Sequence, residues 1–269
     1  MKLDLVSSLA ANRRSFLKGA GVTGLGLATA AMIGSKFGPD MQNVKAASID
    51  DGDILNFALN LEYLEAEFYC MSTLGKTLVQ LEVIDEGDTT GPTTGGAFVK
   101  GLYQSSVGDL SGALRIHEEN HVKFLRSALG SSAVKKPAIN LDALGYGYTS
   151  VASWLELARQ FEDVGVSAYL GAAPLISSKA YLAAAGAILS VEAFHSGAIR
   201  MACIQTGTAS PAVDSQDIPP TSANFFDASS GSLAIPRTPA EVLNIVYGGG
   251  TSSGGFYPDG MNGTITSQS

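Results

Sequence analysis

The chain has 269 residues, 45% of them hydrophobic and 16% charged, so it holds enough apolar side chains for a folded core and is not disordered overall. Removing the first 46 residues, which hold six of the 17 basic and two of the 25 acidic side chains, leaves a net charge of −12. Nucleic-acid phosphates repel such an acidic body, which excludes nucleic acid as a main partner. Two cysteines also exclude a disulfide-rich scaffold and a four-thiolate zinc site.

Residues 1–46 have the layout of an export signal. Arg13-Arg14-Ser15-Phe16-Leu17-Lys18 precedes an uncharged Gly/Ala-rich stretch, residues 19–35, and small residues suitable for cleavage lie near Ala46. The stretch is short and weakly apolar for a permanent membrane span. The paired arginines resemble the twin-arginine motif, which implies the twin-arginine translocase as a partner and a periplasmic or extracellular location. An ordinary secretory signal or a basic tail is the alternative.

Four later segments have the length and apolar period of helices. They cover Asp53–Thr73, about Tyr103–Leu129, about Ser150–Ala172 and about Lys179–Thr206. This pattern predicts an all-α protein with a four-helix bundle over residues 47–206.

The connections between these helices differ in length. The last two helices are joined by a few residues, which predicts an antiparallel hairpin. About 30 residues separate the first two, enough for a lid or a binding loop, and about 20 form a crossover to the third. Residues 207–269 are rich in Pro, Ser, Gly and Asn, so we expect an irregular tail that packs on the bundle, with one short helix near Pro239–Tyr247.

Two of the three histidines follow a glutamate by three residues, as Glu118-x-x-His121 and Glu192-x-x-His195. Residues at this spacing lie on one face of a helix, so each pair presents a carboxylate and an imidazole side by side. Each face also carries apolar residues, which indicates that both pairs point into the bundle. These residues are Leu114, Leu125, Ile188 and Ile199.

The other two helices each supply one glutamate on the inward stripe, Glu62 and Glu162, and each glutamate is followed seven residues later by Tyr69 or Tyr169. The two hairpins therefore repeat one plan. Four buried carboxylates without partners would cost many kcal/mol, whereas two divalent cations would neutralise them. Mixed nitrogen and oxygen ligation suits Fe or Mn. The expected metal ligands are Glu62, Glu118, His121, Glu162, Glu192 and His195.

These residues, in this order, resemble the ferritin-like di-iron/di-manganese carboxylate proteins. Residues 56–69 and 124–130 look more narrowly like the exported branch that includes the plant desiccation-related proteins. The resemblance implies that Glu118 and Glu192 bridge two metals, that Glu62 and Glu162 bind terminally, and that each histidine binds one metal.

One departure from that family concerns the residue before each Glu-x-x-His motif. Many relatives have an acid there that orients a ligand histidine of the other half, whereas this chain has His117 and Val191. We therefore expect Asp163 or Glu65 to orient the ligand side chains instead. His117 is expected at the rim of the site.

Other interpretations stay open for several residues. The Glu-x-x-His pairs are alternatively surface pairs. Glu65 shares a face with Glu62 and is the alternative ligand. Tyr69 and Tyr169 either hydrogen-bond to a ligand carboxylate or serve in redox chemistry, or they are only core aromatics. We expect no role in the site for four further residues. Glu67 and Glu119 are expected to be solvated carboxylates, and Cys70 and Cys203 are expected to be buried free thiols rather than a disulfide.

The sequence thus favours an exported redox enzyme that acts on O2 or peroxide in oxidative stress defence, with two Fe or Mn ions. Its electrons come from a separate donor, or no donor is needed because peroxide is dismutated. The alternative is a stress- or desiccation-protective protein whose metals only stabilise the bundle. Iron storage requires a cage of subunits, which the long first connection and the tail would crowd. Smaller homo-oligomers stay open.

Overall fold

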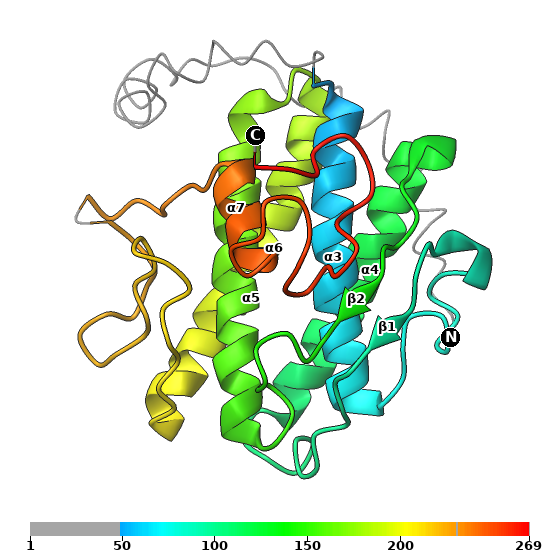
Figure 1. Cartoon of the computed structure of the whole chain (residues 1–269). Coiled ribbons are helices and arrows are strands. Elements are labelled where there is room, and N and C mark those ends of the chain that lie inside the picture. The colour runs from blue at the N-terminus through cyan, green and yellow to red at the C-terminus, as the bar shows by residue number, and fades with distance from the viewer. Residues whose placement is uncertain (1–48, 230, 269) are drawn as a thin grey trace, which may run out of the picture. The chain divides into compact units, whose positions relative to one another are not determined.

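The computed structural model describes residues 49–229 and 231–268 (Figure 1). The predicted twin-arginine motif and the cleavage point near Ala46 lie outside these residues. Four long helices form the bundle: α3 (Asp51–Leu74), α4 (Gly108–Leu129), α5 (Val151–Ala172) and α6 (Lys179–Thr206). Helix α3 packs on α4, and α5 packs on α6, so the bundle consists of two hairpins that meet mainly through α3 and α5. The all-α prediction is confirmed.

The ends of these helices are set by local hydrogen bonds. Asp50 and Asp53 form a reciprocal capping box at the start of α3, and the side chain of Ser178 accepts from the backbone of Tyr181 at the start of α6. Gly75 and Gly207 end α3 and α6 in the left-handed conformation that glycine adopts without strain. The predicted bounds of these two helices were therefore close to those observed.

The prediction was wrong for the start of the second helix, which begins at Gly108 and not near Tyr103. A β-carbon at residue 108 would lie 2.3 Å from the carbonyl oxygen of Tyr103, so the chain makes a close turn there that only glycine permits. Val99 and Leu102 are fully buried and hold these turns against the bundle. The residues just before Gly108 therefore belong to a packed loop and not to the helix.

The first connection is paired with the crossover. Strand β1 (Thr93–Thr94) runs parallel to β2 (Ile139–Asn140), and short 3-10 turns cover Glu86–Asp88, Gly130–Ser132 and Ala173–Leu175. The ammonium group of Lys136 is buried beside β1, where it donates to Thr93 and lies 3.9 Å from Glu67. Glu67 is itself fully buried and accepts from Thr93, so the prediction that it is solvated was wrong. The connection covers a helix face that would otherwise face water.

The tail covers the outer side of α3 and α5 (Figure 1). Its helix α7 (Pro239–Val246) packs on α5, and the hydroxyl of Tyr257 donates to the backbone carbonyl of Asn60 at 2.7 Å. Arg159 of α5 is fully buried and pairs with Asp217 at 2.6 Å. Polar as well as apolar contacts thus fasten residues 207–229 and 231–268 to the bundle.

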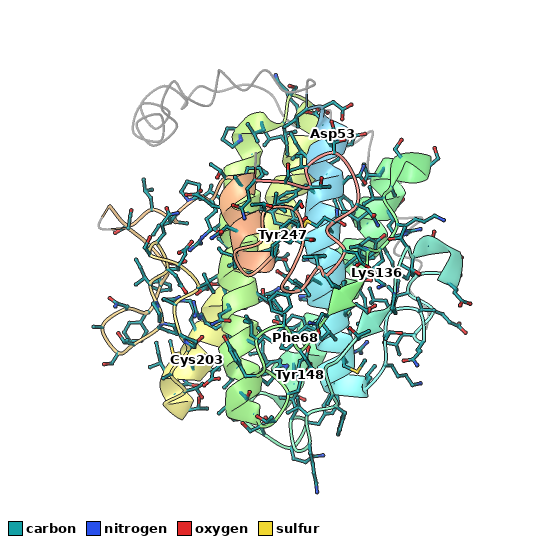
Figure 2. All side chains as sticks on the ribbon, viewed as in Figure 1. Asp53, Phe68, Lys136, Tyr148, Cys203 and Tyr247 are labelled. Atoms are coloured by element: carbon teal, nitrogen blue, oxygen red, sulfur yellow. The ribbon has the colours of Figure 1, made fainter. Side chains whose placement is uncertain are left out.

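Aromatic rings pack together in the core around Phe68, which Figure 2 labels with Tyr148. The ring centroid of Phe68 lies 5.6 Å from that of Tyr148 and 5.1 Å from that of Phe161. Cys70 and Cys203 are buried free thiols, which confirms that prediction.

Helix α6 is the one described helix that could cross a membrane by length and composition. Core helices of soluble proteins meet the same criterion, and α6 turns Glu192 and His195 toward the other three bundle helices.

Candidate metal centre

All six predicted ligands lie together in the middle of the bundle. The four glutamates are at most 2% exposed, and His121 and His195 are 8% and 5% exposed. Each of the four bundle helices contributes at least one of them. Their donor atoms form two groups, and within each group they lie within 4.8 Å of one another.

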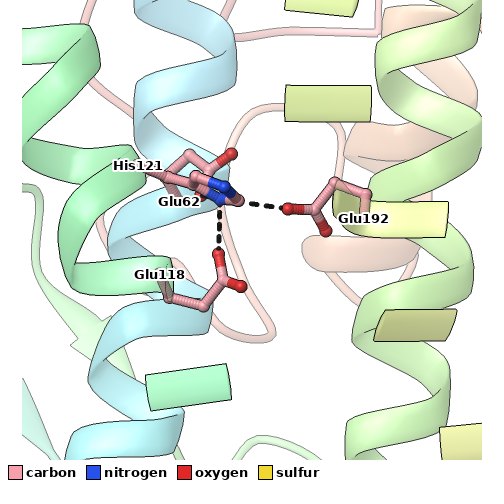
Figure 3. A group of neighbouring side chains, drawn as sticks. All are labelled: Glu62, Glu118, His121 and Glu192. Atoms are coloured by element: carbon pink, nitrogen blue, oxygen red, sulfur yellow. Dashed lines mark hydrogen bonds and ion pairs between the residues drawn. The ribbon is translucent and has the colours of Figure 1, made fainter. Parts of the chain in front are cut away.

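The first group surrounds His121 (Figure 3). Its Nδ1 lies 3.2 Å from Oε2 of Glu62, 3.0 Å from Oε2 of Glu118 and 3.1 Å from Oε1 of Glu192. These three carboxylates come from three different helices. One ring nitrogen therefore faces three carboxylate oxygens at once.

The second group surrounds His195. Its Nδ1 lies 3.0 Å from Oε1 of Glu118 and 3.2 Å from Oε2 of Glu162. Glu118 and Glu192 belong to both groups, and the two oxygens of Glu118 face different histidines. The imidazole centroids of His121 and His195 are 6.1 Å apart. The site is thus two adjacent donor sets that share two carboxylates.

Hydrogen bonds within the protein do not satisfy these atoms. A ring nitrogen carries at most one hydrogen, so Nδ1 of His121 cannot donate to three oxygens. Five buried atoms of the site form no hydrogen bond with the described residues, although four of them lie within ion-pair distance of an opposite group: Oε1 of Glu118, Oε2 of Glu162, both oxygens of Glu192 and Nδ1 of His195. Buried unpartnered polar atoms are rare and costly in folded proteins. Two divalent cations would be bound by these same atoms, so the residues present fit a dinuclear centre.

The pKa values of the site show how protons occupy it without cations. Burial raises the pKa of Glu62 to about 7, and burial together with Glu118 raises that of Glu192 well above its ordinary value. His195 has a pKa raised to about 10, because Glu118 and Glu162 outweigh the opposing effect of burial. At neutral pH the metal-free site therefore retains protons that cations would displace.

The two predicted tyrosines contact the ligands directly. The hydroxyl of Tyr169 donates to Oε1 of Glu62 at 2.5 Å, and that of Tyr69 donates to Oε1 of Glu162. Both rings are buried, and burial raises the pKa of both hydroxyls well above the ordinary value. Neutral hydroxyls can donate, so each tyrosine fixes one of the two unshared glutamates.

The surroundings differ from the prediction in three respects. Asp163 accepts from Ser196 and Arg200 and does not contact either histidine of the site. His117 contacts the ring nitrogen of His195 that does not face the carboxylates: its Nδ1 lies 2.8 Å from Nε2 of His195. His117 itself is exposed. Glu119 was expected to be solvated, but it is half-buried and pairs with Arg115.

Glu65 is buried beside the ligands. A β-carbon built on Gly165 would lie 3.0 Å from Oε2 of Glu192 and 3.1 Å from Oε1 of Glu65, so both carboxylates occupy the room that this glycine leaves. Burial, Glu192 and Glu162 raise the pKa of Glu65 well above its ordinary value. Its carboxyl group thus lies next to a shared ligand and holds its proton more tightly than an exposed glutamate does.

A four-helix bundle with two buried Glu-x-x-His motifs and two further inward glutamates defines a ferritin-like protein. The chain belongs to the ferritin-like domain family, whose model matches residues 50–205, more than half of the chain. It is 25% identical to "Ferritin-like catalase Nec2" of Nesocodon mauritianus over 84% of this chain and 88% of the relative. It is 26% identical to "Desiccation-related protein PCC13-62" of Craterostigma plantagineum over 59% of this chain and 54% of the relative.

Proposed function

We propose that the protein is an exported enzyme that removes hydrogen peroxide by dismutation, with two Mn or Fe ions in the centre. The observation that carries this proposal is the pair of buried donor sets sharing Glu118 and Glu192, whose unpartnered atoms require positive charge. The relative named a ferritin-like catalase supports peroxide as the substrate. Dismutation oxidises one peroxide to O2 and reduces a second to two waters, so no separate electron donor is needed.

The metal ions, when bound, would supply two adjacent redox-active Lewis acids. Glu118 and Glu192 belong to both donor sets and would hold the two ions side by side. Glu62 and Glu162 each serve one position, and Tyr169 and Tyr69 restrict their rotation. Glu65 is buried beside Glu192, and burial raises the pKa of its carboxyl group, so this group can pass to the reduced peroxide one of the two protons that the oxidised peroxide releases.

We propose that the substrate reaches the centre from the side of His117. His117 is exposed yet hydrogen-bonds to His195, so one side chain separates the centre from the surface of α4. A buried centre that lies one side chain from the surface suits a substrate as small as peroxide. Larger substrates would need an opening wider than one side chain.

The test combines metal analysis with a peroxide assay on the same preparation. Protein purified without added metal is expected to contain Mn or Fe, to consume peroxide and to release one O2 for every two peroxides without a reductant. Glu118→Ala removes a ligand of both positions and is expected to lose metal and turnover together. Peroxide consumption that depends strictly on an added reductant would contradict dismutation.

The alternative function is protection without catalysis, which the likeness to a desiccation-related protein favours. In that case the protein binds its metals and is stabilised by them, but it turns over neither peroxide nor O2. Metal removal would then lower the melting temperature, and the peroxide assay would be negative both before and after removal.

Export is part of the proposal and rests on Arg13 and Arg14. Replacing both by lysine is expected to retain the protein in the cytoplasm of a bacterial host that has the twin-arginine pathway. Export of the double variant at the parental level would point to an ordinary secretory signal.

A further inference from the structure

The two hairpins repeat the same ligands, but they differ at the residue before each Glu-x-x-His motif. His117 precedes Glu118 on α4, and Val191 precedes Glu192 on α6. His117 contacts the ligand histidine of the other hairpin: its Nδ1 lies 2.8 Å from Nε2 of His195. The two ring planes differ by 20° with centroids 5.1 Å apart, so the rings meet edge to edge, nearly coplanar.

This contact is suited to the tautomer of His195 that binds a cation. Nδ1 of His195 faces the carboxylates of Glu118 and Glu162 and must be free of hydrogen to bind a cation. The ring hydrogen then lies on Nε2, which donates to Nδ1 of His117. The hydrogen of His117 lies on its own Nε2. The contact therefore holds His195 in its metal-binding tautomer and fixes the angle of its ring.

His121 has no equivalent contact. By the repeat of the hairpins, the position that would serve it is Val191, whose side chain cannot accept a hydrogen bond. Among residues 49–229 and 231–268, none hydrogen-bonds to Nε2 of His121. Its ring is positioned only by packing and by the carboxylates around Nδ1.

We propose that the two metal positions are unequal: the one formed by His195 and Glu162 binds its cation more tightly than the one formed by His121 and Glu62, and fills first, because His117 positions His195. This inference rests on the proposed metal centre. Loss of an outer hydrogen-bond partner of a metal ligand typically weakens metal binding by about 10–100-fold. A difference of this size would separate the two binding steps.

The experiment titrates the metal-free full-length protein with Mn²⁺ and follows free Mn²⁺ by electron paramagnetic resonance. The parent protein is expected to bind two Mn²⁺ in two steps, about tenfold or more apart. His117→Ala is expected to weaken the tighter step by about 10–100-fold and to leave the weaker step unchanged, so that the two steps merge. His117→Gln, whose amide oxygen can accept from Nε2 of His195, is expected to restore the separation.

Further variants assign the steps and control for the substitution. Glu162→Gln is expected to remove the tighter step, and Glu62→Gln the weaker one. Asn120→Ala changes another exposed residue of α4 and is expected to leave both steps as in the parent. Because His117 is exposed, His117→Ala is expected to keep the helical circular dichroism and melting temperature of the metal-free parent.

The outcomes separate this inference from the proposed function. A parent protein that binds no Mn²⁺ or Fe²⁺ would overturn the proposed metal centre itself. Two bound Mn²⁺ with equal affinities in the parent, or two unchanged steps in His117→Ala, would overturn the inference and leave the metal centre standing. Loss of the weaker step in Glu162→Gln would also overturn it, because the order of filling would be reversed.

Discussion

The hydroxyl of Tyr169 on α5 donates a 2.5 Å hydrogen bond to Glu62 on α3. Tyr69 on α3 makes the reciprocal bond to Glu162 on α5. Each hairpin therefore fixes the unshared glutamate of the other. The two bonds also join the hairpins through the polar centre, in addition to the apolar packing of α3 on α5.

Removing one of these hydroxyls is expected to destabilise the metal-free protein. Tyr169→Phe leaves Oε1 of Glu62 buried without its donor, which typically costs about 1–3 kcal/mol. At about 2–4 °C for each kcal/mol in a protein of this size, the melting temperature should fall by several degrees. Tyr103→Phe is the control, since Tyr103 is 43% exposed. Equal melting temperatures for the two variants would show that the Tyr169 bond contributes nothing to stability.

The sharing of Glu118 predicts unequal effects of two charge-removing substitutions. Glu118 belongs to both donor sets, whereas Glu62 belongs to one. Glu118→Gln is expected to lower the bound metal from two ions to none or nearly none, and Glu62→Gln from two to one. Elemental analysis after gel filtration measures this directly. Retention of both ions in Glu118→Gln would refute the role of Glu118 as a shared ligand.

Stability without metal is expected to fall as pH rises from about 5 to about 9. Burial moves the pKa of Glu62 from 4.5 to about 7, so across that interval the unfolded chain releases a proton that the folded protein keeps. The pKa of His195 moves from 6.5 to about 10, and its contribution is complete below pH 6.5 and lost as pH rises through 10. Both groups therefore lower the free energy of unfolding as pH increases.

Bound metal should reverse this trend, because cations compete with the same protons. The difference in melting temperature between metal-loaded and metal-free protein is thus expected to widen from pH 5 to pH 9. Thermal melts in matched buffers measure it. The lowered pKa of Glu118, where His121 and His195 outweigh burial, acts only below pH 4.5 and does not alter the direction. A metal-free melting temperature that rises over this range would contradict the assignment of buried protons.

Gly165 is expected to matter for metal binding more than for folding. An alanine there would press on Oε2 of Glu192 and Oε1 of Glu65, while alanine is favoured over glycine in a helix by about 1 kcal/mol. Gly165→Ala should therefore weaken Mn²⁺ binding by about tenfold or more without destabilising the metal-free protein. Gly186→Ala is the matched control, because a β-carbon at residue 186 meets nothing within 4 Å. Equal Mn²⁺ affinity in both variants would show that this space is not needed.

The helical period and the repeated Glu-x-x-His spacing were enough to predict the bundle and to place all six polar residues on inward faces. Glu67 could not be predicted as buried, because what covers it is a connection whose path depends on Lys136 and Thr93 far along the chain. The role of His117 was within reach of the sequence, since the residue before Glu118 faces the other hairpin. It was missed because an acid was expected there, and a neutral imidazole makes the same kind of contact.

The contact between the tail and α3 constrains how the protein is made. Asn60 hydrogen-bonds to Asn262, 202 residues later, and its carbonyl accepts from Tyr257. Synthesis proceeds from the N-terminus, so these bonds form only after residues 257–262 have left the ribosome. A chain that ends before Tyr257 would lack these bonds. The outer side of α3 would then be exposed to solvent even if all four long helices had formed.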